Sequence, residues 1–105
     1  MRQRQLLKHN LTVPQILREY GKMFRQIKKR YSDGQNGRCA IGLIMSYHGW
    51  NGKDDCQACG KLIGTLVTLS HAGIDKNLII HLNDSGATFN EIADHLDNIS
   101  RKNSC

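Results

Sequence analysis

Proline is nearly absent from the sequence, and long apolar runs are absent altogether. One proline occurs in 105 residues, so very few positions are barred from the interior of a helix. No stretch approaches the roughly 18 consecutive apolar residues that a membrane-spanning helix needs. The opening residues, MRQRQLLKHNLTVPQ, also lack the apolar segment of a secretory signal. We therefore expect a cytoplasmic protein that does not engage a membrane.

Acidic residues are scarce in the first third of the chain. Residues 1–38 contain ten lysines and arginines but only two acidic residues, Glu19 and Asp33, which gives a formal charge of +8. Residues 39–105 contain five basic and seven acidic residues, so they contribute −2 to the total of +6. A basic region followed by an acidic remainder predicts a polyanionic partner for the first third.

The rest of the composition is ordinary for one globular domain. Apolar residues make up 39% and charged residues 23% of the chain, and the length suits a single core. We predict an all-α, compact bundle of about five helices over residues 12–105, preceded by a flexible basic arm at residues 1–11. The helix-period patterns cover about residues 13–31, 38–47 and 60–71, the stretch between Asp75 and Gly86, and the stretch after Thr88. Gly73 is placed to end the third helix, and Thr88 with Glu91 forms a capping box for the fifth. The residues of the fifth helix that we expect to face inward are Phe89, Ile92, Ala93, Leu96 and Ile99. The third helix is apolar nearly all round, so we expect it at the centre, with the first and fifth packed against it.

The first predicted helix has one apolar and one basic face. Thr12, Pro14 and Gln15 form a helix start with a capping box, and Gly21 predicts close packing or a bend in the middle of the helix. Apolar residues then recur every three or four positions, with cations nearly opposite them. These cations are Arg18, Lys22, Arg25 and Lys29, with Lys28 and Arg30 beside them and with Arg2, Arg4 and Lys8 on the arm.

Cations at one-turn spacing suit the phosphates of a nucleic acid. Our leading hypothesis is therefore a small, non-enzymatic binding protein that docks on nucleic acid or a ribonucleoprotein through this basic helix. The first alternative is a regulator or inhibitor, as phages encode, that sets the same face against an acidic protein. A solvated helix face would carry similar residues, but Glu19 alone offers little relief from the repulsion among its cations.

Four cysteines in a chain without an export signal suggest thiols or metal ligands rather than disulfides. Cys56 and Cys59 have the spacing at which both sulfurs can bind one zinc ion. His71 and Cys39 are the preferred further ligands, and His48 is another candidate. No cofactor is expected in the leading hypothesis, and zinc is the alternative. A redox role for the CxxC pair would require a neighbouring βαβ unit, which the sequence does not predict.

We do not expect an enzyme, although the sequence contains residues that could form a cysteine nucleophile with a histidine. Cys39 begins a predicted helix, where backbone amides lower the pKa of a thiol. His48, His71 or His81, together with Asn83 or Asp84, would complete a Cys-His-Asn or Cys-His-Asp set. No carboxylate pair, phosphate-binding glycine loop or nucleophile elbow accompanies these residues, and an apolar helix usually buries a cysteine as part of the core.

The last two predicted helices resemble the start of a helix-turn-helix. A glycine-containing turn, NDSGA, precedes the segment TFNEIADHL, and residues 98–102 would begin the recognition helix. About one turn remains before Cys105, which is too short to lie in a major groove. A truncated helix-turn-helix regulator is therefore a further alternative, and an ordinary helical hairpin explains the same pattern.

Two segments together resemble a group of small prokaryotic and phage proteins. The segment GRCAIG, residues 37–42, matches the helix start that these proteins share, and LNDSGATFNEIAD, residues 82–94, matches their later ND.G.(S/T)F.EIAD motif. The resemblance implies a shared compact fold in which Cys39 approaches Asn83 and Asp84. It implies no activity, and it does not extend to the basic helix or the CxxC pair.

Overall fold

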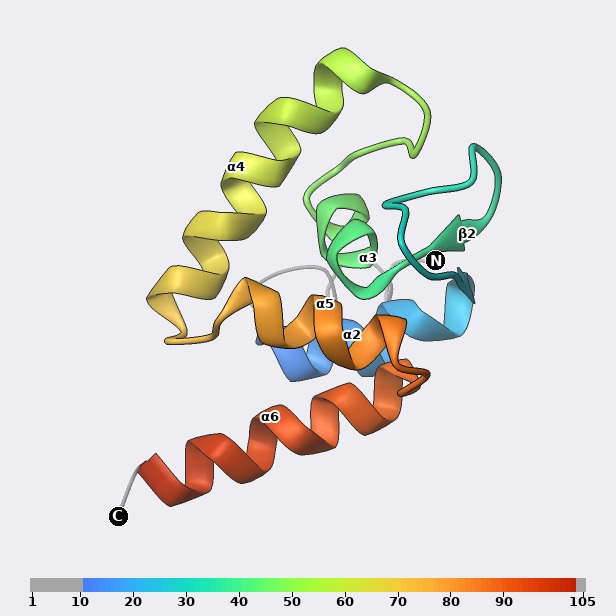
Figure 1. Cartoon of the computed structure of the whole chain (residues 1–105). Helices are drawn as coiled ribbons and strands as arrows, with labels where there is room; N and C mark the ends of the chain where they lie inside the picture. The colour runs from blue at the N-terminus through green and yellow to red at the C-terminus, as the bar shows by residue number, and fades with distance from the viewer. Residues whose placement is uncertain (1–10, 104–105) are drawn as a thin grey trace, which may run out of the picture.

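Side-chain caps set where most of the helices begin. The structure, a computed structural model, describes residues 11–103, and their side chains as far as residue 99. Its elements are α2 (Val13–Tyr20), the 3-10 turn η1 (Gly21–Met23), β1 (Arg25–Gln26), β2 (Gly37–Arg38), α3 (Ala40–Tyr47), α4 (Asp55–His71), α5 (Lys76–Asp84) and α6 (Phe89–Asn103) (Figure 1). This confirms the predicted all-α class and the number of about five helices, with one very short parallel strand pair added.

The predicted capping boxes are both present. Thr12 Oγ1 accepts the amide N–H of Gln15, whose side chain accepts the N–H of Thr12 in return. The same exchange joins Thr88 and Glu91 at the start of α6. Helix α4 begins five residues before the predicted Gly60, because Asp54 accepts the N–H groups of the first turn. These bonds satisfy amides that have no partner within the helix.

Helix α3, rather than the predicted third helix, lies at the centre of the fold (Figure 1). Every residue from 40 to 45 is buried, and α2, α4 and α5 pack around this short helix. The prediction that α4 lies at the centre was wrong, because two of its apolar side chains, Ile63 and Val67, are 62% and 49% exposed. Only one side of α4 contacts the core, through Thr65 and Leu69. No described helix is long and apolar enough to cross a membrane.

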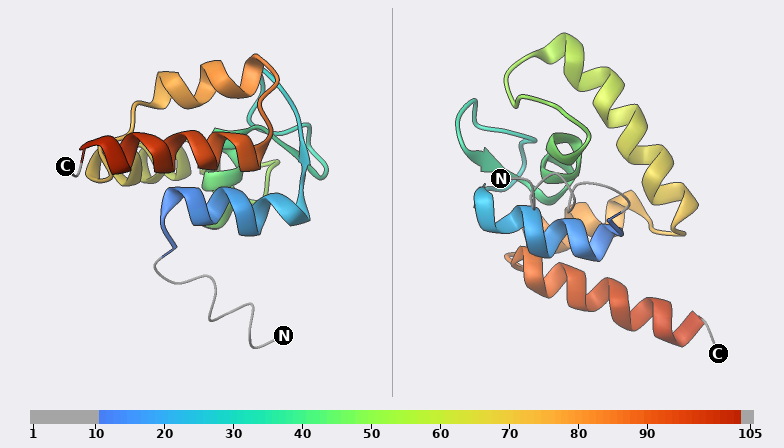
Figure 2. Two further views of the ribbon diagram at one scale, coloured as in Figure 1. Left: turned by 90° about the horizontal axis from the view of Figure 1, so that it is seen from below. Right: turned by 180° about the vertical axis from the view of Figure 1, so that it is seen from behind.

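Helix α6 lies alongside α2 and closes the other side of the core (Figure 2). Its buried residues are Phe89, Ile92, Ala93 and Leu96, four of the five predicted to face inward, and the fifth, Ile99, is half-buried. Phe89 packs against the end of α2, where a Cβ added to Gly21 would lie 2.8 Å from the ring. The close packing predicted at Gly21 is therefore confirmed.

The predicted helix over residues 13–31 ends at Tyr20. After the η1 turn the backbone becomes extended at Phe24, and β1 pairs with β2 in parallel. The N–H groups of Arg25 and Ile27 donate to the carbonyls of Asn36 and Arg38, both at 3.0 Å. These long-range bonds replace the helical ones, so the predicted row of cations along one helix face does not exist.

Gly42 lets the chain cross closely over α3. A Cβ at this position would overlap the backbone carbonyl group of Tyr31, far inside van der Waals contact. The obstructing atoms belong to the backbone, so no rotation of a side chain could make room. The segment that leads from β1 to β2 is thereby seated against the central helix.

Two glycine substitutions in helices test this contact. We expect Gly42→Ala to lower the free energy of unfolding by about 1–3 kcal/mol, because the added methyl group forces two backbones apart. Gly60→Ala in α4 meets nothing within 4 Å, so it should raise stability by up to about 1 kcal/mol. Urea denaturation of both variants measures the difference. Equal changes in both would contradict the proposed close approach.

Candidate functional site

Three of the predicted basic residues pair with acidic residues of the same chain. Arg18 on α2 lies 2.6 Å from Asp94 and 2.8 Å from Asp97, both on α6. The hydrogen bonds to these two carboxylates raise the pKa of Arg18. Lys22 lies 3.3 Å from Glu19, and the third pair, Arg25 with Asp33, lies in the loop described next. Arg2, Arg4 and Lys8 lie outside the described residues.

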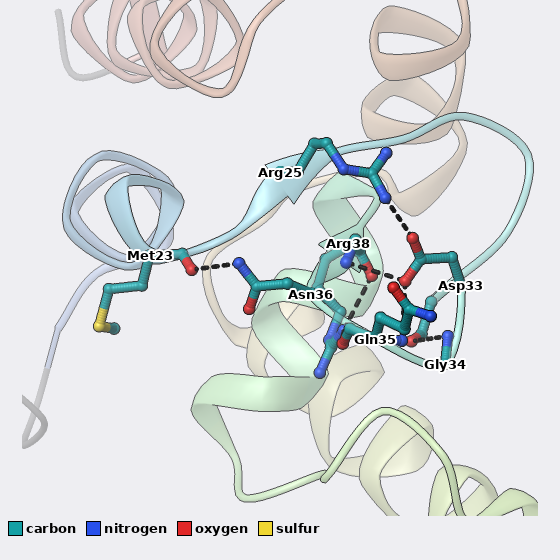
Figure 3. A network of polar contacts seen from close by, with 9 residues as sticks. Met23, Arg25, Asp33, Gly34, Gln35, Asn36 and Arg38 are labelled. Atoms are coloured by element: carbon teal, nitrogen blue, oxygen red, sulfur yellow. Dashed lines mark hydrogen bonds and ion pairs between the residues drawn. The ribbon is translucent and has the colours of Figure 1, made fainter.

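Asp33 organises the loop between β1 and β2 (Figure 3). Its carboxylate forms an ion pair with Arg25 and accepts the N–H groups of Gln35 and Gly37, both at 2.9 Å. The two backbone hydrogen bonds are the main reason that the pKa of Asp33 is lowered, and Arg25 adds to the effect. Arg25 thus holds a loop in place and is not a free cation of a helix face.

Arg38 is a buried cation without a carboxylate partner among the described residues. The residue is 3% exposed, and its guanidinium group lies over the ring of Phe24, 4.6 Å from the ring centre. It donates to the hydroxyl groups of Ser46 and Ser32 and to the carbonyls of Gln35, Gly37 and Asn51. Burial lowers the pKa of Arg38. The residue therefore cross-links the loop to α3, a role that the sequence did not reveal.

The three remaining cations form an exposed loop. We call Lys28, Lys29 and Arg30 the basic loop; all are exposed, and none forms an ion pair with another described residue. Lys29 has a positive φ of 66°, which is uncommon for a residue other than glycine. Its N–H donates to the Asp84 carboxylate at 3.0 Å. This bond holds the loop in one conformation while the three side chains face solvent.

Two amide side chains, the buried Asn83 and the half-buried Gln26, fix both ends of the segment that carries the basic loop. Gln26 Nε2 donates to Asn83 Oδ1 at 2.8 Å and to the carbonyl of Ala87 at 2.7 Å. Asn83 Oδ1 also accepts the N–H of Ala40 at 3.0 Å, and its Nδ2 donates to the carbonyl of Ile27 at 2.8 Å. Strand β1, the start of α3 and the end of α5 therefore meet at one point, where the two motif segments come into contact.

The predicted zinc ligands are not brought together. Cys56 and Cys59 are exposed in the first turns of α4, whereas His71 ends the same helix about 18 Å away at the helical rise of 1.5 Å per residue. Cys39 is buried at the start of α3. The described residues contain no group of three or more potential metal ligands. The structure therefore does not bring the four predicted ligands together, because α4 separates His71 from the cysteine pair and Cys39 lies at the start of α3.

Cys39 caps α3, and it forms no hydrogen bond with a histidine among the described residues. Its sulfur accepts the N–H of Gly42 at 3.4 Å, and burial raises the pKa of the thiol. A raised pKa disfavours the reactive thiolate. His48 lies at the far end of α3 and contacts Thr68 Oγ1 at 3.2 Å. The backbone amides at the helix start lower the pKa of the Cys39 thiol, but burial raises it by more.

The helix-turn-helix interpretation fails at its last element. Residues 98–102, taken as the start of a recognition helix, continue α6 without a break. No second helix follows α6 within the described residues. No family model matches the chain, and no curated protein or solved structure matches it.

Replacing Asn83 tests the hydrogen bonds that its side chain makes with Gln26, Ile27 and Ala40. We expect Asn83→Ala to lower the free energy of unfolding by about 2–4 kcal/mol, because the N–H of Ala40, the amide of Gln26 and the carbonyl of Ile27 lose a partner. Asn77→Ala changes an exposed residue of the same helix and should stay within about 0.5 kcal/mol of the parent. Thermal and urea denaturation report both values. A mild effect at Asn83 would refute its structural role.

The cysteines should differ in reactivity. At neutral pH, iodoacetamide should label Cys56 and Cys59 at least about tenfold faster than Cys39, whose thiol is buried and held protonated. Peptide mass spectrometry after timed quenching measures each rate. In denaturant the three rates should converge. Rapid labelling of Cys39 in the native protein would show that its cap is open.

Proposed function

We propose that the protein is a non-enzymatic nucleic-acid-binding protein that contacts phosphates through its basic loop. The observation that carries this proposal is the contrast among the cations. Arg18, Lys22 and Arg25 are paired within the chain, whereas the basic loop exposes three consecutive positive charges without an ion pair among the described residues. Adjacent unpaired cations repel one another, and a polyanion relieves that repulsion.

The backbone of the loop also supports binding. Lys29 is held in an uncommon conformation by the bond from its N–H to Asp84, and Gln26 and Asn83 anchor the chain just before it. A preformed loop loses little conformational entropy when it binds. Residues in sparsely populated backbone conformations also cluster at ligand-binding sites. The interface is therefore smaller than the predicted helix face, and it has a fixed shape.

A salt titration tests the proposal. We expect fluorescence anisotropy with a labelled oligonucleotide to show an association constant that falls as the salt concentration rises. A plot of the logarithm of this constant against the logarithm of the salt concentration should have a slope of about −2 to −3, as expected for three phosphate contacts. The triple variant Lys28→Gln, Lys29→Gln, Arg30→Gln should lose most of the affinity and most of the slope. Each substitution keeps a long polar side chain and removes only the charge.

A charge-matched control removes the effect of net charge. Lys53→Gln, Lys61→Gln and Lys76→Gln change three lysines on other parts of the surface and lower the net charge by the same amount. This control should bind nearly as the parent does. Equal losses in the two triple variants would contradict a local site. If the parent instead captures an acidic protein after nuclease treatment and binds no oligonucleotide, the proposal fails.

A further inference from the structure

A pocket of about 350 Å³ opens beside the basic loop. One wall comes from Lys29, Arg30 and Tyr31, and another part of the lining comes from the end of α5, with Ile80, Asn83 and Asp84. The start of α3 forms the floor, where Ala40 and Ile41 are 0% and 1% exposed. The pocket therefore combines an apolar floor with a charged rim. The proposed function uses the rim only.

The polar groups that α3 and Asn83 bring to the pocket already have hydrogen-bond partners. The N–H of Ala40 donates to Asn83 Oδ1, which also accepts from Gln26, and Asn83 Nδ2 donates to the carbonyl of Ile27. The sulfur of Cys39 accepts the N–H of Gly42. Ile41 and Ile80 add only hydrocarbon surface. A fully hydrated phosphate or sugar would lose hydrogen bonds on entering such a space. A flat, largely apolar ring would lose few hydrogen bonds to water.

The rim provides groups that suit the edge and face of a nucleobase. Tyr31 is 37% exposed at the mouth, so its ring is accessible for stacking. Asp84 gives one carboxylate oxygen, Oδ1, to the N–H of Lys29, and a carboxylate can accept further bonds from exocyclic amino groups. Lys29 and Arg30 of the basic loop line the same pocket, where the adjoining phosphates would be.

We infer that the pocket takes an unstacked base, so that the protein binds single-stranded nucleic acid in preference to a duplex. This inference rests on the proposed function and deepens it. In a duplex the bases are stacked and paired, and extruding one costs free energy. A loop that used its cations alone would not favour the single strand, because the duplex has the higher charge density. The strand preference therefore separates a base site from a purely electrostatic surface.

The test compares one labelled oligonucleotide alone and annealed to its complement, by fluorescence anisotropy at low salt. The parent protein should bind the single strand at least about tenfold more tightly, as stacking of one base on an aromatic side chain allows. Ile80→Trp, which fills the pocket, should reduce single-strand affinity to near the duplex value and leave duplex affinity unchanged. Ile63→Trp adds the same bulk on the exposed face of α4 and should change neither.

A second pair of variants keeps the test decisive if Ile80→Trp does not fold. Tyr31→Leu should lose most of the single-strand preference, whereas Tyr31→Phe should retain it because the ring remains. Circular dichroism confirms that each variant is folded. Equal affinity of the parent for both strands would overturn the base pocket while the proposed function stands. Failure to bind either strand at low salt would overturn the proposed function itself.

Discussion

The side-chain amide of Asn83 is 2% exposed and holds together segments that lie far apart in the sequence. It accepts from Gln26 and from the N–H of Ala40, and it donates to the carbonyl of Ile27. A buried amide tolerates no missing partner, because each unpaired polar group costs free energy. Strand β1, α3 and α5 can therefore take only positions that satisfy these bonds. The conformation of the basic loop and the pocket beside it both depend on this arrangement.

The features that sequence reasoning predicted well are local. The capping boxes at Thr12 and Thr88, and the stop at Gly73 with its φ of 71°, depend on bonds across a few residues or on the conformation of one. The buried face of α6 follows from its helical period. These signals lie within one segment, so they can be read without knowing what the segment packs against.

The features that it missed depend on distant partners. Phe24, Ile27 and Tyr31 continue the helical spacing of α2, yet each meets a different part of the chain. Phe24 lies under the Arg38 guanidinium, Ile27 lies beside Gly37, and the carbonyl of Tyr31 rests on Gly42. An apolar period alone does not separate a helix from an extended segment that packs at several points. Of the predicted basic surface that falls within residues 11–103, only the basic loop therefore remains without an ion pair. The role of Gln26 had no sequence signal at all.

The shared amide pair also constrains how the molecule can fold. Gln26 contacts residues about sixty positions away, at Asn83 and at the N–H of Phe89. Neither the first half of the chain nor the α5–α6 hairpin can satisfy these groups alone. We therefore expect a fragment of either half to remain unstructured, and the whole chain to assemble in one cooperative step. The chain must lose the conformational entropy of closing these long loops before the contacts can stabilise it. We therefore expect slower folding than for an up-and-down bundle of similar length.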